Sequence, residues 1–299
     1  MLQLFVFYFL NQSCMFGSMR NVMTLFILLF GVVCYSAAQE IKVVTWNIFL
    51  RPAFLLDKQI ERVDSIAAHL LSNNYDVIAL QEVFHRKARK RLISQLDSCF
   101  PYYLEPERSG VFKINSGLMT FSRYPIIKDK HTFYSNLIAA DKLSSKGLQM
   151  AHVMVGGDTL LIANTHLQAG TEDRFQEARV DEYLHIREML RGKVIAVVLL
   201  GDLNTDKNNT TRHEVMLCKL KFIDGQILNR EIGSANLANQ ELFFAEEGGE
   251  QVLDYILSST SPASNISIKN RNIKCFRSKW NGKLSNLSDH NAVEAIIIL

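Results

Sequence analysis

Side chains that could do chemistry follow directly after the apolar stretches of this chain. The clearest example is the apolar run 197–200, which is followed at once by Gly201, Asp202 and Asn204. Similar side chains stand at or beside five other apolar runs, at Asn47, Glu82, His166, Asp254, and Asp289 with His290. Functional sites in α/β proteins form at the ends of buried strands, where polar side chains follow the apolar ones. The sequence therefore predicts one polar site built from several strand ends.

The residue types in this set favour metal-assisted hydrolysis of a phosphate ester. Carboxylate and amide oxygens such as those of Glu82 and Asn47 are the ligands that Mg²⁺ prefers. His166 and His290 can move protons near neutral pH. The set contains no cysteine and no serine in a nucleophile-elbow setting. Attack by water is therefore favoured over a covalent mechanism.

Each of these residues also has an ordinary structural explanation. An aspartate at a strand end often caps a turn, a lone histidine often packs, and Asn47 could form an Asx turn. Six separate strand ends carry such residues, however, and their coincidence favours a shared site.

The elements that must position these residues alternate along the chain. Apolar runs predict strands at 41–46, 77–80, 116–121, 150–155, 159–165, 193–200 and 292–298, and helical spacing predicts helices within 60–70, 88–100, 173–190 and 214–220. Residues 206–250 are otherwise expected to be loops. Interleaved helices and strands favour a single α/β domain over residues 39–299. A chain of 299 residues that is 48% hydrophobic can bury a substantial core.

The first 38 residues are typical of a secretory leader. They contain one charged residue, Arg20, followed by an apolar run over 22–35 and by Ser36-Ala37-Ala38. This order predicts a signal peptide cleaved near Ala38, and hence a secreted protein. The net charge of +3 gives no sign of the strongly basic face that non-specific nucleic-acid binding requires.

Three cysteines lie beyond the leader, at Cys99, Cys218 and Cys275. They allow at most one intramolecular disulfide. Burial of all three as small apolar side chains is the alternative.

Short motifs follow one another along the chain: TWN at 45–47, LQEV at 80–83, SGL at 116–118 with SRYPI at 122–126, NTHLQA at 164–169, GDLN at 201–204, LDYI at 253–256 and SDH at 288–290. In this order they resemble the endonuclease/exonuclease/phosphatase superfamily, whose fold is DNase I-like, over essentially all of 41–299. Narrower motifs are similar to those of the secreted neutral sphingomyelinases C of bacterial type: QEVF at 81–84, LSSKG at 143–147, THLQA at 165–169 and SDHNAVEA at 288–295.

The resemblance implies an α/β fold in four layers, with two facing mixed sheets flanked by helices and a metal site at one end. It implies that Glu82 is the principal Mg²⁺ ligand with Asn47 beside it. Asp202, Asn204 and Asp289 would complete the polar floor and hold a second metal, or the phosphate and its attacking water.

The resemblance also implies the acid–base roles. His290 would be the general base, with its ring oriented by Asp254, a pairing that fixes the tautomer and supports the imidazolium. His166 would donate to a phosphoryl oxygen or protonate the leaving ceramide oxygen, and Lys146 would add positive charge at the phosphate.

The implied reaction is hydrolysis of sphingomyelin to ceramide and phosphocholine by a monomer at a sphingomyelin-containing membrane surface. Mg²⁺ is the expected cofactor, with Mn²⁺ or Co²⁺ as substitutes. The candidates for a membrane-facing rim are Phe54 and Leu55, which precede Leu56, and Phe276 with Trp280. Packing of Phe54–Leu56 against the following helix is the alternative for the first group.

Three other functions stay open. A DNase I-like secreted nuclease would use the same catalytic residues, but it should present basic and polar groups along a groove. A phosphoinositide phosphatase shares the metal site and is typically cytosolic, which the leader argues against. A non-catalytic secreted binding protein predicts the loss of site residues, and none of the expected ones is missing.

Overall fold

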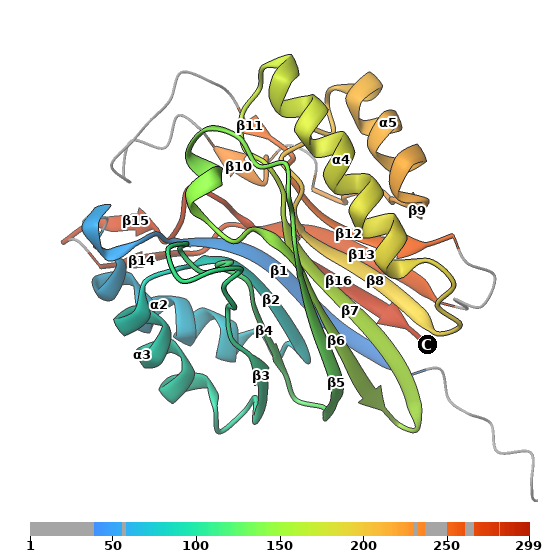
Figure 1. The fold of residues 1–299 in the computed structure, drawn as a ribbon. Helices are drawn as coiled ribbons and strands as arrows, with labels where there is room; N and C mark the ends of the chain where they lie inside the picture. The colour runs from blue at the N-terminus through green and yellow to red at the C-terminus, as the bar shows by residue number, and fades with distance from the viewer. Residues whose placement is uncertain (1–38, 56–57, 230–231, 237–249, 261–265, 281) are drawn as a thin grey trace, which may run out of the picture. The chain divides into compact units, whose positions relative to one another are not determined.

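Two six-stranded mixed sheets face each other at the centre of the computed structural model (Figure 1). The strands of the first sheet, in spatial order, are β13 (Ser267–Lys274), β16 (Ala292–Ile298), β1 (Glu40–Leu50), β2 (Val77–Val83), β4 (Met119–Ser122) and β3 (Tyr102–Leu104). Those of the second are β5 (Ile126–Phe133), β6 (Gly147–Val155), β7 (Asp158–His166), β8 (Ala196–Asp202), β12 (Asp254–Ser259) and β9 (Phe222–Ile223). Strands β1 and β2 run parallel, as do β7 and β8.

The structure describes residues 39–299 except 56–57, 230–231, 237–249, 261–265 and 281. The expected leader and Leu56 lie outside the described residues. Residues 39–299 form one compact unit. Within the part of the chain that is described, no helix is long and apolar enough to cross a membrane.

Helices cover the outer face of each sheet. Helices α2 (Gln59–Ser72) and α3 (Arg86–Leu96) pack on the first sheet, and α4 (Asp173–Leu190) and α5 (Thr210–Leu220) pack on the second (Figure 1). A third apolar cluster fills the space between the sheets. The expected four-layered α/β sandwich is therefore confirmed. The remaining short elements are η1 (Ala53–Leu55), η2 (Ala139–Leu143), β10 (Ala235–Asn236), β11 (Glu250–Gln251), β14 (Arg277–Lys279) and β15 (Leu284–Asn286).

Side-chain alternation along the strands determines which residues reach the space between the sheets. In β8, Val197 and Leu199 pack under the helices, whereas Val198 and Leu200 face the other sheet. Because successive side chains point to opposite faces, the next interior position after Leu200 is Asp202. The apolar pattern thus carries a carboxylate into the space between the sheets at the point where β8 ends.

A glycine lets two of these strands approach closely beside the site. Gly201 has φ +144°, and a Cβ atom there would lie 1.9 Å from the carbonyl oxygen of Thr165. Only glycine can bring β8 this close to β7 without a clash.

Several details differ from the sequence-based expectations. Strands β5 and β13 and the β14–β15 hairpin were not predicted, and α3 ends at Leu96, before the buried Phe100. The cysteine alternatives are also corrected: Cys99, Cys218 and Cys275 are exposed rather than buried, and Cys99 and Cys218 form no disulfide.

Candidate active site

Strand pairing brings three of the expected residues together at one end of the sandwich. His166 at the end of β7 and Asp254 at the start of β12 both pair with Asp202 at the end of β8. All three occupy interior-facing positions of their strands, as does Asn47 in β1. The Nδ2 atom of Asn47 lies 3.1 Å from Asp202 Oδ2 and 3.1 Å from Glu82 Oε1, so this amide joins the two sheets.

Glu82 reaches the site through an irregular backbone conformation. The preceding residues Ile78 and Leu80 face the helices, so regular alternation would send Glu82 the same way. Its φ of +58° instead interrupts the alternation, and it is Val83 that packs in the helix-side core. A non-glycine residue in the left-handed region costs free energy, and such residues cluster at functional sites.

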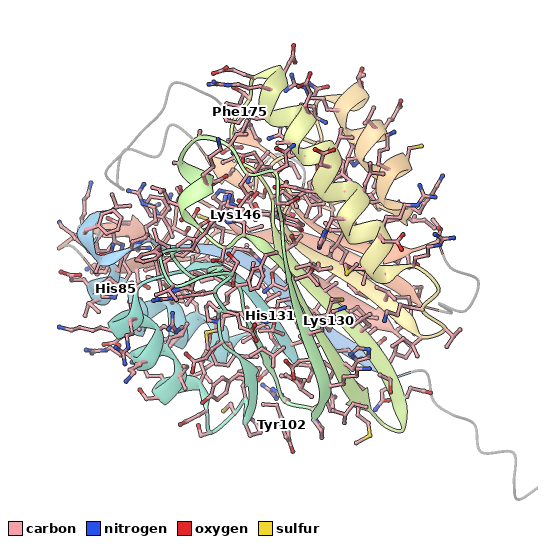
Figure 2. All side chains as sticks on the ribbon, viewed as in Figure 1. His85, Tyr102, Lys130, His131, Lys146 and Phe175 are labelled. Atoms are coloured by element: carbon pink, nitrogen blue, oxygen red, sulfur yellow. The ribbon has the colours of Figure 1, made fainter. Side chains whose placement is uncertain are left out.

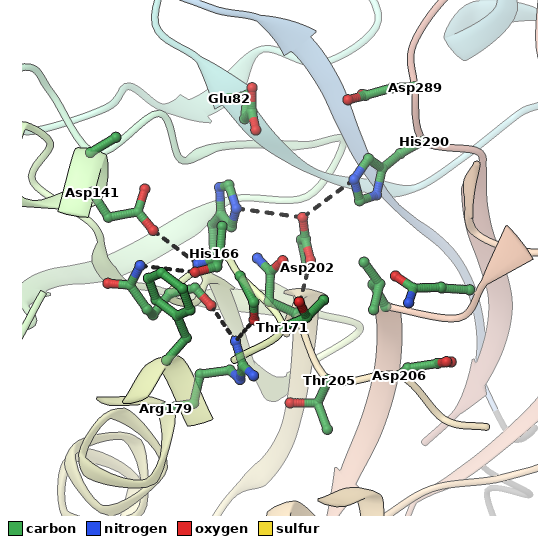
Figure 3. A pocket seen from close by; sticks show the side chains of 18 of the residues that line it. Glu82, Asp141, His166, Thr171, Arg179, Asp202, Thr205, Asp206, Asp289 and His290 are labelled. Atoms are coloured by element: carbon green, nitrogen blue, oxygen red, sulfur yellow. Dashed lines mark hydrogen bonds and ion pairs between the residues drawn. The ribbon is translucent and has the colours of Figure 1, made fainter. Parts of the chain in front are cut away.

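His290 lies between two carboxylates. Its Nδ1 is 2.8 Å from Asp254 Oδ2. On the other side of the ring, Nε2 is 3.7 Å from Asp202 Oδ2 (Figure 3). Burial by itself lowers the pKa of His290, but the negative charges of Asp254, Asp202 and Asp289 outweigh it and hold this pKa well above the ordinary value.

His166 has the opposite electrostatic environment. Its Nε2 lies 3.1 Å from Lys146 Nζ and 3.4 Å from Asp202 Oδ2. Burial, followed by the positive charges of Lys146 and His290, holds the pKa of His166 well below its ordinary value. The ring is therefore neutral at pH 7. The Lys146 ammonium also donates to Asp141 Oδ2 at 2.9 Å and to the Leu167 carbonyl at 2.8 Å, so it is held firmly at the pocket.

The carboxylates of Glu82 and Asp289 fit a divalent cation. The Oε2 atom of Glu82 is buried and has no hydrogen-bond partner among the described residues. Burial and then the negative charge of Asp289 raise the pKa of Glu82 to about 7. Two neighbouring carboxylates, one with an unsatisfied oxygen, supply the hard oxygen ligands that suit Mg²⁺, whereas the Asn47 oxygen accepts from the Phe49 N–H at 3.2 Å. The residues present therefore fit this group.

A second set of possible ligand atoms includes the histidine. One atom each from Asp202, Asp254 and His290 lie within 4.8 Å of one another. The 2.8 Å contact from Asp254 to His290 Nδ1 has the length of a hydrogen bond, which explains this proximity without an ion. We therefore place the candidate cation at Glu82 and Asp289.

A pocket of about 650 Å³ is lined by Glu82, His166, Asp202, Asp289 and His290. Glu82 and Asp289 lie on one side of Asp202 and His290, and Asp206 and Thr205 lie on the other (Figure 3). Asn204, with φ +49°, donates from Nδ2 to the Leu167 carbonyl at 3.0 Å and lines the wall. Lys146 lies at the end of the sheets opposite Tyr102 (Figure 2).

The expected membrane-facing residues divide into three groups. Phe54 is 70% exposed and Leu55 is half-buried. Trp280 is half-buried, packs against the helix-side core and donates from Nε1 to the Asn286 carbonyl at 2.9 Å. The prediction for Phe276 is wrong: its ring is buried against Trp46 and His69, with centroids 5.0 and 4.8 Å away. Its side chain stabilises the core and cannot face a membrane.

Sequence reasoning missed the residues that hold the loop after His166. Glu182 of α4 accepts from the Gln168 backbone N–H at 2.9 Å, and Arg179 donates to the carbonyls of Gln168 and Gly170 at 2.8 Å each. Charged residues at buried positions of a helix, where apolar residues are expected, were the available signal. Asp141 was missed because it lies outside any apolar strand.

Comparisons with known proteins agree with this geometry. Residues 44–290 match the Endonuclease/Exonuclease/phosphatase family. Sphingomyelinase C of Leptospira interrogans is 29% identical over 247 residues, which cover 74% of this chain and 44% of that protein. A crystal structure of Staphylococcus aureus beta toxin superimposes with a TM-score of 0.75 at 21% identity, covering 85% of this chain and 99% of the toxin chain. Another structure of that toxin, a double mutant with bound magnesium ions, gives a TM-score of 0.72 at 21% identity, covering 86% of this chain and 99% of the other.

The chain spans between 40% and 60% of the length of three sphingomyelinase relatives. The structural likeness, at these identities, supports the fold. The family match extends from within β1 to His290 and so includes the candidate active-site residues. This chain belongs to the endonuclease/exonuclease/phosphatase family.

Proposed function

We propose that this protein is a Mg²⁺-dependent phosphodiesterase that hydrolyses sphingomyelin to ceramide and phosphocholine. The observation that carries the proposal is the position of His290, bonded to Asp254, in the same pocket as the unsatisfied carboxylate of Glu82. The names of several relatives, Sphingomyelinase C of Leptospira interrogans among them, support the choice of lipid.

His290 acts as the general base in this proposal. Its Nε2 takes a proton from the attacking water as the oxygen of that water bonds to phosphorus, and the bond from phosphorus to the ceramide oxygen breaks. The ceramide oxygen then takes a proton from solvent water, and the His290 imidazolium returns its proton to solvent. Asp254 on Nδ1 stabilises the imidazolium that forms. The negative charges of Asp254, Asp202 and Asp289 raise the pKa of His290 and so make its ring a better proton acceptor.

Lys146 and His166 bind the phosphate from the other side. Lys146 carries the positive charge that favours a phosphoryl oxygen. Its ammonium donates to His166 Nε2, so the neutral ring carries its proton on Nδ1, which has no hydrogen-bond partner among the described residues. A neutral imidazole fits hydrogen bonding to a phosphoryl oxygen better than it fits protonation of the leaving ceramide oxygen. Glu82, Asn47 and Asp289 would hold Mg²⁺, which supplies positive charge for the oxygens of the phosphoryl group; Mn²⁺ or Co²⁺ would substitute.

We further propose that the protein is a secreted monomer whose residues 1–38 are removed near Ala38, and that residues 39–299 are one catalytic domain. The 70% exposed ring of Phe54 is consistent with contact to a lipid surface, and no nucleic-acid partner is expected.

The experiment that tests the activity measures phosphocholine release from sphingomyelin vesicles by the purified protein, with Mg²⁺ and with EDTA. Phosphatidylcholine vesicles and supercoiled DNA serve as alternative substrates. We expect release that needs the metal, prefers sphingomyelin and is lost in His290→Asn. His185→Asn is the matched control, since His185 bonds to Thr132 on the outer side of the second sheet.

Nicking of DNA without lipid hydrolysis would replace the proposed substrate by a nucleic acid. Inactivity on all three substrates would favour the phosphatase or the binding protein.

A further inference from the structure

Two neighbouring apolar side chains are almost fully exposed in the loop between β3 and β4. Val111 is 86% exposed and Phe112 is 102% exposed. An apolar pair that contacts so little of its own chain loses the free energy of burial. A partner outside the protein would recover this free energy.

The exposed pair is attached firmly to the segment that leads to Lys146. The backbone N–H of Ile114 donates to the Leu143 carbonyl at 2.8 Å, and the Ser145 hydroxyl donates to the Ile114 carbonyl at 2.7 Å. The N–H of Ser109 donates to the same hydroxyl at 3.0 Å. These bonds hold Val111 and Phe112 near Leu143, which is itself 64% exposed.

The loop lies at the end of the sandwich where the pocket opens. Strand β4 runs antiparallel to β2, so the start of β4 lies beside the end of β2 that carries Glu82. The N–H of Val83 donates to the Gly117 carbonyl at 2.9 Å, which confirms this placement. Phe54 follows β1, whose parallel pairing with β2 brings it to the same end.

Positive charges flank the exposed pair. Arg108 and Lys142 are exposed, and Lys113 is half-buried. Two nearby acids are engaged with other cations, since Glu105 lies 3.0 Å from Arg89 and Asp141 lies 2.9 Å from Lys146. Glu107 lies 3.5 Å from His131, but burial lowers the pKa of His131, so Glu107 keeps its negative charge. An apolar tip with basic neighbours is complementary to a bilayer, which has an apolar interior and phosphate groups at its surface.

We propose that Val111 and Phe112 insert into a lipid bilayer while Arg108, Lys113 and Lys142 bind the phosphates of its headgroups. This contact would place the mouth of the pocket against the membrane surface. The inference rests on the proposed function in that the substrate is a membrane lipid.

Tryptophan fluorescence tests insertion without any need for catalysis. Phe112→Trp is compared with Val194→Trp on phosphatidylcholine–sphingomyelin vesicles in EDTA, with and without brominated acyl chains. Val194 is 82% exposed, follows Lys193 and precedes β8, so it is an apolar site with a basic neighbour at the opposite end of the sheets. After subtraction of the wild-type signal, we expect a blue shift and bromine quenching for Phe112→Trp alone. No quenching, or equal quenching of both variants, would overturn the proposal.

A second measurement separates this surface from the proposed activity. In co-sedimentation, the affinity of the double variant Val111→Ser/Phe112→Ser for vesicles should be lower than that of the wild type by about tenfold or more. The affinity of Val194→Ser should equal that of the wild type. Hydrolysis of sphingomyelin dispersed in detergent should be unchanged in both.

The outcomes are distinguishable. Quenching of Phe112→Trp in a protein that hydrolyses no sphingomyelin would uphold the surface and reject the proposed function. If the protein hydrolyses sphingomyelin but the double variant binds vesicles as the wild type does, the proposed function is upheld and the membrane-binding surface is rejected.

Discussion

The Nδ1 atom of His290 lies 2.8 Å from the Oδ2 atom of Asp254, a buried carboxylate at the start of β12. Both residues are fixed by further bonds. The N–H of Asp254 donates to the Ser234 hydroxyl at 3.0 Å, and the indole of Trp46 donates to the His290 carbonyl at 2.9 Å. Asp254 therefore determines which nitrogen carries the proton, and it leaves Nε2 as the atom that can accept one.

Replacement of this carboxylate by an amide should remove activity without unfolding the protein. We expect Asp254→Asn to lower kcat by about 10³-fold or more, the scale found when the aspartate of a Ser-His-Asp triad is replaced. Because the Asp254 charge raises the pKa of His290, the acidic limb of the pH–rate profile should also move to lower pH. Asp158→Asn, at the exposed start of β7, is the control. An unshifted profile would show that Asp254 has a purely structural role.

Metal binding should depend on pH because protons compete for the same carboxylates. Burial raises the pKa of Glu82 to about 7 and also raises the pKa of Asp289. A divalent cation favours the charged carboxylates, so binding should release protons and strengthen as the pH rises from 5.5 to 7.5, by about tenfold or more. Calorimetry in two buffers of different ionisation enthalpy measures both quantities. Glu82→Gln should abolish most of the proton release, and a pH-independent affinity would contradict this assignment of the ligands.

A buried amide beneath the site connects the two sheets. Asn164 of β7 is fully buried, and its Nδ2 donates to the carbonyls of Leu80 and Met119 at 3.1 Å each. Its Oδ1 accepts from Gln81 at 2.8 Å. Asn164→Ala removes these hydrogen bonds, and of the groups involved Gln81 Nε2 still donates to Thr45 Oγ1 at 3.0 Å. Each buried group left unsatisfied costs about 1–3 kcal/mol.

The free energy of unfolding of Asn164→Ala, measured in urea, should therefore fall by at least about 2 kcal/mol. Asn208→Ala, at an exposed position, should change it by less than about 0.5 kcal/mol. Equal stabilities of the two variants would contradict a role for this amide in joining the sheets.

Strand alternation explains how much of the site could be predicted from the sequence. Asp202 continues the interior positions of Val198 and Leu200, and His166 continues those of Leu160 and Ile162. The apolar pattern that identifies each strand thus also identifies the face on which its last polar residue lies. The same patterns predict a single α/β domain, whereas the four layers are what the resemblance to the superfamily implies.

Other features depend on contacts between distant segments. Burial of Phe276 results from its packing on Trp46 and His69, which lie more than two hundred residues earlier in the chain. Glu82 enters the site through a left-handed backbone conformation that its apolar neighbours do not encode. The partner of Lys146, Asp141, lies in the 3₁₀ segment η2, which has no apolar periodicity to identify it.

Glu182 is a buried acid behind the pocket whose charge is poorly compensated. Its Oε2 accepts from the Gln168 N–H at 2.9 Å, and its Oε1 has no partner among the described residues. Burial raises the pKa of Glu182 from 4.5 to about 8, although the Gln168 hydrogen bond and the positive charge of Lys146 oppose this shift. The carboxyl group is therefore neutral in the folded protein at pH 7.

This raised pKa predicts a loss of stability at high pH that Glu182→Gln should reduce. Between pH 4.5 and 8 the folded state binds more protons at Glu182 than the unfolded state does, so the free energy of unfolding falls as the pH rises through this window. An amide carries no charge and can still accept from Gln168. We expect the variant to match the wild type at pH 4 and to be more stable at pH 9, on the order of a few kcal/mol. Urea denaturation at both pH values measures the difference. Glu188→Gln, at an exposed position of the same helix, is the control and should show the pH dependence of the wild type. If the stability of Glu182→Gln depends on pH as that of the wild type does, Glu182 is already charged at neutral pH.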